Sequence, residues 1–277
     1  APFTYLWNDP AAQTSANATG LCAGGFNTTV TDVNGCMDTI GTTITEPASL
    51  TPTMLSEIGV SCFGDCNGSA EVSVSGGSAP ITYLWSVGQT TALATGLCGG
   101  IHTVDITDAN GCTIQDTATI AEPALLVNVF STTDVDCFGN STGSATASVS
   151  GGSAPYTYQW DDLSLQTTAT ASALDSGVYN VIITDLNGCS INETVTITEP
   201  VEIVLVLDTT GSSCGQADGT ACLTVSSGIA PFTYQWDDPG SQSTACATGL
   251  LAGSYNASVT DNTGCFNTQL AVINDLG

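Results

Sequence analysis

An internal repeat of about 76 residues constrains this chain more than any other feature. The pattern Thr-Tyr-x-Trp occurs four times, and a Gly-Cys pair follows each copy at a regular distance. The tryptophans are Trp7, Trp85, Trp160 and Trp236, and the cysteines of the Gly-Cys pairs are Cys36, Cys112, Cys189 and Cys265. Two independent markers in one register predict tandem structural units. With Glu-Pro closing the first three units at Pro47, Pro123 and Pro200, we expect units at 1–47, 48–123, 124–200 and 201–277, and the first unit lacks its opening half.

Within a unit the apolar residues recur every second position, which is typical of β-strands. Residues 70–75 and 194–198 alternate in this way, and Asn-Gly at 110–111 and 187–188 is a strong hairpin signal. No segment has helical periodicity. Six or seven short strands per unit, with the tryptophan on a middle strand, predict an all-β chain of tandem immunoglobulin-like β-sandwiches.

The charge composition excludes several classes of partner. The chain has no Lys or Arg and 26 Asp plus Glu, so its formal net charge is −26. A nucleic-acid groove needs cations that this chain lacks, and we expect no nucleic-acid partner. No apolar run reaches the length of a membrane span, and we expect no membrane insertion. Because 42% of the residues are hydrophobic, the acidity does not indicate disorder.

Twelve cysteines beside one histidine predict disulfides, and hence an oxidising, extracellular compartment. Each complete unit has an early cysteine and a Gly-Cys cysteine, while other cysteines appear or vanish between units in couples. The predicted bonds are Cys62–Cys112, Cys137–Cys189, Cys214–Cys265, Cys66–Cys98 and Cys222–Cys246. Cys22 and Cys36 belong to the incomplete unit, and we expect their partners outside residues 1–47. A Cys22–Cys36 bond or metal binding by thiolates is the alternative.

Several spaced motifs together resemble the SprB-type repeat of long surface adhesins in gliding and other Bacteroidetes. They are Ser61-Cys62-Phe63-Gly64, the string from Gly76 to Trp85, Thr107 to Cys112, and Ala121-Glu122-Pro123. The resemblance covers all four units. It implies a secreted, filamentous surface protein of tandem β-sandwiches without catalytic residues. The absence of Lys and Arg and the additional cysteines leave open a motility adhesin or a static fibre.

The sequence contains no convincing catalytic group. His102 is the only histidine, and Phe26, Tyr179 and Tyr255 stand at its position in the other units, so we interpret it as an aromatic substitute at the core or rim. No base accompanies a serine nucleophile. The carboxylates at 161–162 and 237–238 follow the tryptophan strand, and unit two has Ser86-Val87 there, which favours a solvated loop. We expect no enzyme.

Calcium is the metal that this composition favours. The candidate ligands are the aspartates four residues before each Gly-Cys cysteine, namely Asp32, Asp108, Asp185 and Asp261. An Asx-turn that caps the hairpin explains the same residues without an ion, and it is the favoured interpretation. Three threonines resemble the Asp-Ser/Thr-apolar signal of Bacteroidetes O-glycosylation: Thr39, Thr117 and Thr209.

These observations predict a non-catalytic, extracellular cell-surface filament or adhesin, a structural spacer or an attachment module. The alternative is a glycan-binding surface module, if the four tryptophans stack on sugars. Partners are expected to be further copies of the chain in a filament, the continuation of a longer chain, or a surface or glycan target. We expect the opening half of the first unit to be supplied by upstream residues or by a neighbouring subunit.

Overall fold

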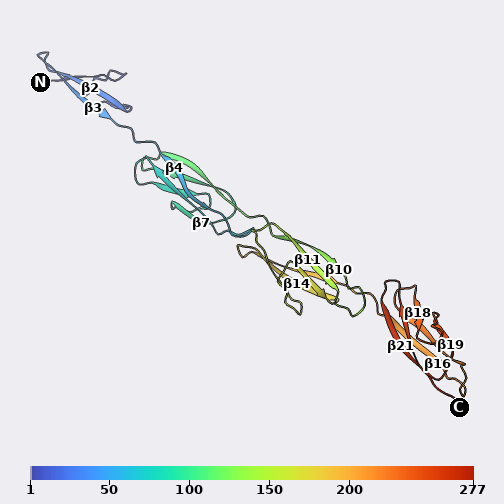
Figure 1. Cartoon of the computed structure of the whole chain (residues 1–277). Coiled ribbons are helices and arrows are strands. Elements are labelled where there is room, and N and C mark those ends of the chain that lie inside the picture. The colour runs from blue at the N-terminus through green and yellow to red at the C-terminus, as the bar shows by residue number, and fades with distance from the viewer. Residues whose placement is uncertain (1) are drawn as a thin grey trace. The chain divides into compact units, whose positions relative to one another are not determined.

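The structure, a computed structural model, describes residues 2–277 of the chain. It divides into two compact units, Ala1–Glu122 and Pro123–Gly277. All of the regular elements are β-strands, twenty-one of them in the described residues (Figure 1). None of these residues forms a helix with the length and hydropathy that crossing a bilayer requires.

The first unit contains one complete sandwich of two three-stranded antiparallel sheets. One sheet has the order β4-β5-β7 and the other β6-β8-β9. The strands are β4 (Thr51–Ile58), β5 (Gly68–Ser75), β6 (Thr82–Trp85), β7 (Leu93–Leu97), β8 (Gly100–Thr107) and β9 (Thr113–Ile120). These two sheets correspond to the central strands of an immunoglobulin sandwich. Trp85 lies on β6, the equivalent of the strand that carries the buried tryptophan in that fold.

The second unit repeats this arrangement twice. Its first sandwich has sheets β10-β11-β13 and β12-β14-β15, and its second has β16-β17-β19 and β18-β20-β21. The strands of the first are β10 (Val127–Thr133), β11 (Gly143–Ser150), β12 (Thr157–Trp160), β13 (Thr170–Leu174), β14 (Gly177–Thr184) and β15 (Ser190–Ile197). Those of the second are β16 (Val204–Thr210), β17 (Gly219–Ser227), β18 (Thr233–Trp236), β19 (Cys246–Leu250), β20 (Gly253–Thr260) and β21 (Phe266–Ile273).

Residues 4–44 form only one sheet, β1 (Thr4–Trp7), β2 (Gly24–Thr31) and β3 (Met37–Ile44). It corresponds to the sheet β6-β8-β9 of the complete sandwich. Its inner face is uncovered: Ile44 is 38% exposed, whereas Ile120, at the same place in β9, is 2% exposed.

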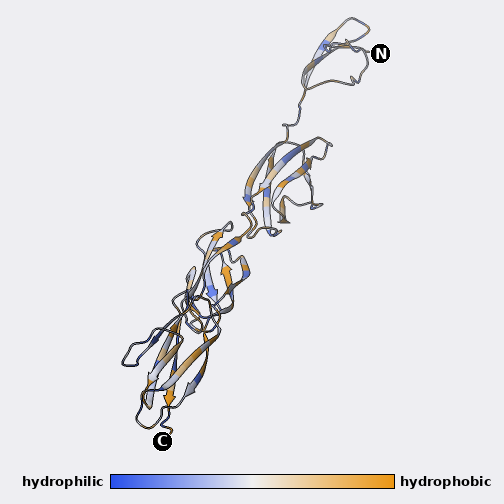
Figure 2. Cartoon of the chain, turned by 90° about the vertical axis from the view of Figure 1, so that its right-hand side faces the viewer, coloured by the Kyte–Doolittle hydropathy of each residue, from blue (hydrophilic) through white to orange (hydrophobic). Residues whose placement is uncertain are grey.

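The cores follow from strict alternation along the strands. In β5, Gly68, Ala70 and Val72 are buried, while the residues between them lie partly in solvent. Figure 2 shows apolar and polar residues alternating along the strands. At the centre, Trp85 is 1% exposed, and its indole Nε1 donates a hydrogen bond to the carbonyl of Thr91 at 2.9 Å. The predicted all-β, immunoglobulin-like fold is confirmed.

The two ends of each sandwich carry different loops. At one end the turn after β8 lies against the turn after β5, because the Ala109 N–H donates to the Ser78 carbonyl at 2.9 Å. The incoming connection joins this end as well, since the Gly77 N–H donates to the Ala48 carbonyl at 2.6 Å. The loop after β4 lies at the other end, where the Val60 N–H donates to the Ala121 carbonyl at 2.9 Å. Eight-residue strands at about 3.3 Å per residue separate the two ends by about 25 Å.

Candidate functional site: the junction between repeats

The first component of the junction is the Gly-Cys turn, which ends in the Gly-Cys pair and is formed by residues 108–112 and their equivalents. One carboxylate oxygen of Asp108 accepts hydrogen bonds from the N–H groups of Asn110 and Cys112, both at 2.9 Å. The other oxygen accepts from the Ser78 N–H at 3.0 Å. Asp185 makes the equivalent three bonds at 2.8–2.9 Å. The aspartate therefore closes an Asx-turn and ties it to the neighbouring turn.

The second component is the Cys-Phe-Gly loop, formed by residues 62–64 and 137–139. The Gly139 N–H donates to the carboxylate of Glu199 at 2.9 Å, and the Gly64 N–H donates to that of Glu122 at 2.7 Å. Glu122 and Glu199 of the second and third Glu-Pro pairs thus each hold the loop of their own sandwich. From the sequence, Glu-Pro indicated only a boundary between units. Its regular recurrence was the signal that could have identified this role.

In the second unit, a disulfide joins the two components across the junction between consecutive repeats. Cys137 of one sandwich bonds Cys265 of the next, with a Cα–Cα distance of 5.5 Å. Phe138 and Ile203 line the pocket of about 200 Å³ beside this bond. The side-chain amide of Asn267 donates to the Ile203 carbonyl at 2.8 Å. The junction is therefore packed, hydrogen-bonded and covalently linked.

This bond corrects the predicted pairing of early cysteines with Gly-Cys cysteines inside one unit. The expected Cys137–Cys189 and Cys214–Cys265 bonds are wrong, because Cys137 bonds Cys265. Cys62–Cys112 is also wrong, since Cys112 is a free thiol and Cys62 is disulfide-bonded. The early loop and the Gly-Cys turn lie at opposite ends of the same sandwich, beyond the reach of a disulfide.

The other two predicted bonds are present. Cys66 is joined to Cys98, and Cys222 is joined to Cys246. Cys222 and Cys246 lie directly opposite each other in the register of β17 and β19. Cysteines that appear in couples were therefore a reliable signal, because both members are close in space.

The remaining cysteines differ in state. Cys189 is disulfide-bonded, like Cys62. Cys22, Cys36 and Cys214 are exposed free thiols, like Cys112. Cys22 and Cys36 are therefore not bonded to each other, and partners outside residues 1–47 stay a prediction.

The calcium hypothesis finds its four aspartates at four separate Gly-Cys turns. Asp108, Asp185 and Asp261 are buried, and Asp32 makes the two turn hydrogen bonds to Asn34 and Cys36. The carboxylates of Asp108 and Asp185 face N–H donors, which repel a cation. No group of three or more His, Cys, Asp or Glu residues suited to a metal ion occurs in residues 2–277. Calcium binding stays an untested prediction.

The hydrogen bonds of the turns lower aspartate pKa values. The N–H groups of Ser78 and Cys112 hold the pKa of Asp108 below its ordinary 3.8. Burial raises the pKa of Asp185, but the N–H groups of Ser153 and Cys189 outweigh it, and the pKa is lowered. The side-chain hydroxyl of Thr263 likewise lowers the pKa of Asp261.

We therefore predict that acid destabilises the chain only below about pH 4. A lowered folded-state pKa contributes stability that is complete above the unfolded pKa and is lost as the pH falls through the folded value. No Lys or Arg salt bridge exists to be lost at higher pH. Thermal melts of the oxidised chain should give a constant midpoint from pH 7 to about pH 5, and a falling one below about pH 4. A steep fall between pH 6 and about pH 4.5 would contradict this origin of the acid sensitivity.

The glycan-binding alternative requires exposed tryptophans, and those of the complete sandwiches are not on the surface. Trp85, Trp160 and Trp236 are each 1% exposed, so a sugar ring has no access to them. Trp7 is half-buried in the single sheet. The interpretation of the tryptophans of the complete sandwiches as sugar-stacking residues is wrong, because they fill the cores.

His102 and the three threonines also have structural settings. A ring nitrogen of His102 is 2.9 Å from the Cys98 carbonyl, and the Tyr179 and Tyr255 hydroxyls donate to the equivalent carbonyls at 3.0 and 3.1 Å. His102 thus takes the place of a tyrosine that anchors a turn. Thr39, Thr117 and Thr209 are exposed on strands. Their glycosylation stays a prediction.

Comparison with solved structures finds proteins of similar architecture at low similarity. The N-terminal eight Ig domains of Down Syndrome Cell Adhesion Molecule match 99% of this chain at 9% identity and a TM-score of 0.29. The chain spans 56% of the length of that structure. Invasin, a bacterial integrin-binding protein, matches 98% of this chain and 72% of its own length, at 10% identity and a TM-score of 0.35. No curated relative matches the sequence.

Comparison with protein families gives a specific result. The SprB repeat model matches three segments, 60–90, 129–165 and 207–241. Each segment begins in the first strand of a complete sandwich or in the loop just after it, and ends shortly after the tryptophan strand. These three segments match the SprB repeat, as the motifs in the sequence predict.

Proposed function

We propose that this chain is a segment of a non-catalytic, extracellular surface filament or adhesin, in which its sandwiches act as a disulfide-stapled structural spacer. The SprB repeats and the disulfides support a location outside the cytoplasm. The adhesive contact itself is not assigned to any residue of this segment.

One observation carries the spacer role, the disulfide Cys137–Cys265. It connects the end of one sandwich to the start of the next, next to the Glu-Pro connection that already joins them. Two covalent links at one junction restrict its bending, and Pro200 adds stiffness because its ring fixes φ. A cross-link between modules resists separation under a pulling load, which is what a spacer on a cell surface requires.

Protease treatment of intact cells that produce the protein tests the proposed location. A protease of broad specificity should release peptides of this segment into the medium while a cytoplasmic marker stays inside the cells. Trypsin is the matched control, because the segment has no Lys or Arg and should remain uncut between residues 1 and 277. Retention of every peptide until the cells are lysed would contradict an exposed surface location.

A glycan array separates the spacer from the glycan-binding module. We expect no binding by the oxidised chain above that of its reduced and alkylated form, because the tryptophans of the complete sandwiches are enclosed. Specific binding that disappears on reduction would favour the glycan-binding function.

A further inference from the structure

The first unit contains a pocket at the position where the second unit has a filled junction. The pocket has a volume of about 660 Å³ and lies between the connection at 46–50 and the Gly-Cys turn of the sandwich β4–β9. The equivalent pocket of the second unit, about 200 Å³, is lined by Cys137 and Phe138 of the preceding Cys-Phe-Gly loop. The comparison indicates that the larger pocket lacks an occupying loop.

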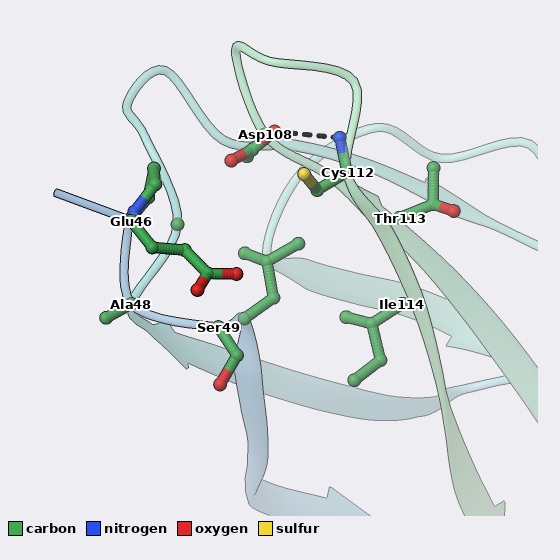
Figure 3. A pocket seen from close by; sticks show the side chains of 10 residues that line it. Glu46, Ala48, Ser49, Asp108, Cys112, Thr113 and Ile114 are labelled. Carbon is green, nitrogen blue, oxygen red and sulfur yellow. Dashed lines mark hydrogen bonds between the residues drawn. The ribbon is translucent and has the colours of Figure 1, made fainter. Parts of the chain in front are cut away.

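The side chains around the larger pocket are more exposed than their equivalents around the smaller one, as expected for an empty site beside a filled one. Cys112 is exposed and free, whereas Cys265 is 6% exposed and bonded. Leu50 is half-buried, whereas its equivalent Ile203 is 4% exposed. Figure 3 shows the carboxylate of Glu46 and the sulfur of Cys112 both directed into the pocket.

The glutamate identifies which loop belongs in the pocket. Glu122 and Glu199 each accept a hydrogen bond from the glycine N–H of the Cys-Phe-Gly loop in their own sandwich. Glu46 stands at the same place in the connection that follows β3. It is exposed, and no residue among 2–277 donates a hydrogen bond to its carboxylate. By analogy with Glu122 and Glu199, the loop that suits Glu46 is the Cys-Phe-Gly loop of a sheet that packs on the inner face of β1–β3.

We propose that this pocket is an acceptor site for the Cys-Phe-Gly loop of another SprB-type opening sheet, and that Cys112 forms a disulfide with the cysteine of that loop. Phe occupies the apolar space beside Leu50 and Ile114, and Glu46 accepts the glycine N–H. The bond forms when the two thiols give up two protons and two electrons to an oxidised disulfide-exchange protein, which is reduced to its dithiol. The inference deepens the proposed spacer function and rests on the same junction, but not on the cellular location.

A synthetic peptide tests the site in vitro. The probe has the sequence of residues 134–142, with the sulfur of Cys137 carried as a mixed disulfide with thionitrobenzoate. Attack by the Cys112 thiolate joins the peptide to the chain and releases coloured thionitrobenzoate, so the step is balanced and visible. In the oxidised 277-residue chain we expect Cys112 to react about tenfold or more faster than Cys214, because docking raises the local concentration of the probe.

Matched variants separate docking from simple thiol exposure. Changing the phenylalanine of the probe to alanine, or introducing Glu46→Ala in the chain, should remove most of the preference for Cys112. Glu193→Ala, on β15 in the second unit, should leave it unchanged. Equal rates at Cys112 and Cys214 with both peptides would overturn the acceptor site, whatever the cellular location of the protein.

A non-reducing peptide map of native material tests the partner. We expect a Cys112 peptide linked to a peptide that contains Cys-Phe-Gly and comes from a further repeat. Cys112 recovered as a free thiol would overturn the proposal. Cys112 linked to Cys214 of a second copy would overturn the assigned occupant and establish a head-to-tail polymer instead.

Discussion

Replacing Cys137 and Cys265 together by serine is expected to lower the stability of the second unit by about 5 kcal/mol in the chain-entropy model. The bond encloses 128 residues and spans two sandwiches, so it removes much freedom from the unfolded chain. Hydrogen exchange of the β21 amides, followed by mass spectrometry, should then become faster by about a thousandfold or more.

The bond Cys222–Cys246 provides the control for this experiment. It encloses only 24 residues within one sheet, and its removal should cost about 3.5 kcal/mol by the same model. The control should leave the two sandwiches of the second unit coupled, whereas loss of Cys137–Cys265 should let them exchange independently. Unchanged exchange in the Cys137→Ser, Cys265→Ser chain would show that the cross-link does not stabilise the second unit.

Trp160→Ala is expected to destabilise its sandwich by about 3–5 kcal/mol, the usual cost of removing a large aromatic side chain from a core. Trp160 is 1% exposed, and its ring centroid lies 6.0 Å from that of Phe130. A sandwich of this size has a total stability of roughly 4–11 kcal/mol, so the variant should be largely or wholly unfolded at modest temperature. Urea unfolding followed by fluorescence and circular dichroism measures the effect.

Leu163→Ala is the matched comparison, because Leu163 is fully exposed in the loop that follows the same strand. It should change stability by less than about 0.5 kcal/mol. If both variants unfolded at the same urea concentration as the native chain, Trp160 would not be a core residue, and a surface role in sugar binding would need to be reconsidered.

Local patterns in the sequence predicted most of the fold. The alternation in β5 and β15 and the Asn-Gly turns are visible within a few residues of sequence. The tryptophan spacing is visible when the copies of the repeat are compared. The same comparison identified Cys66 with Cys98 and Cys222 with Cys246. In each couple the two residues lie beside each other in the folded chain, so the loss of one removes the reason to keep the other.

The calcium and sugar-stacking hypotheses depended on where side chains point, and residue type alone does not give that direction. An aspartate can serve as a cation ligand or as a hydrogen-bond acceptor. The carboxylate of Asp108 accepts hydrogen bonds from three N–H groups. The same tryptophan stacks on a sugar or fills a core, and Trp85 lies between the two sheets.

By itself, then, the sequence determined the repeat, the strands, the sandwich class and two disulfides that each lie within one sandwich, Cys66–Cys98 and Cys222–Cys246. Only the tertiary structure decided that Cys137 bonds the following repeat. Counting residues between cysteines gives a distance along the chain but not the end of the sandwich at which each cysteine lies. A disulfide needs Cα atoms within about 7 Å, and the eight-residue strands of one sandwich hold its early loop and its Gly-Cys turn about 25 Å apart. Cys137, at the end of one sandwich, therefore bonds Cys265, at the start of the next.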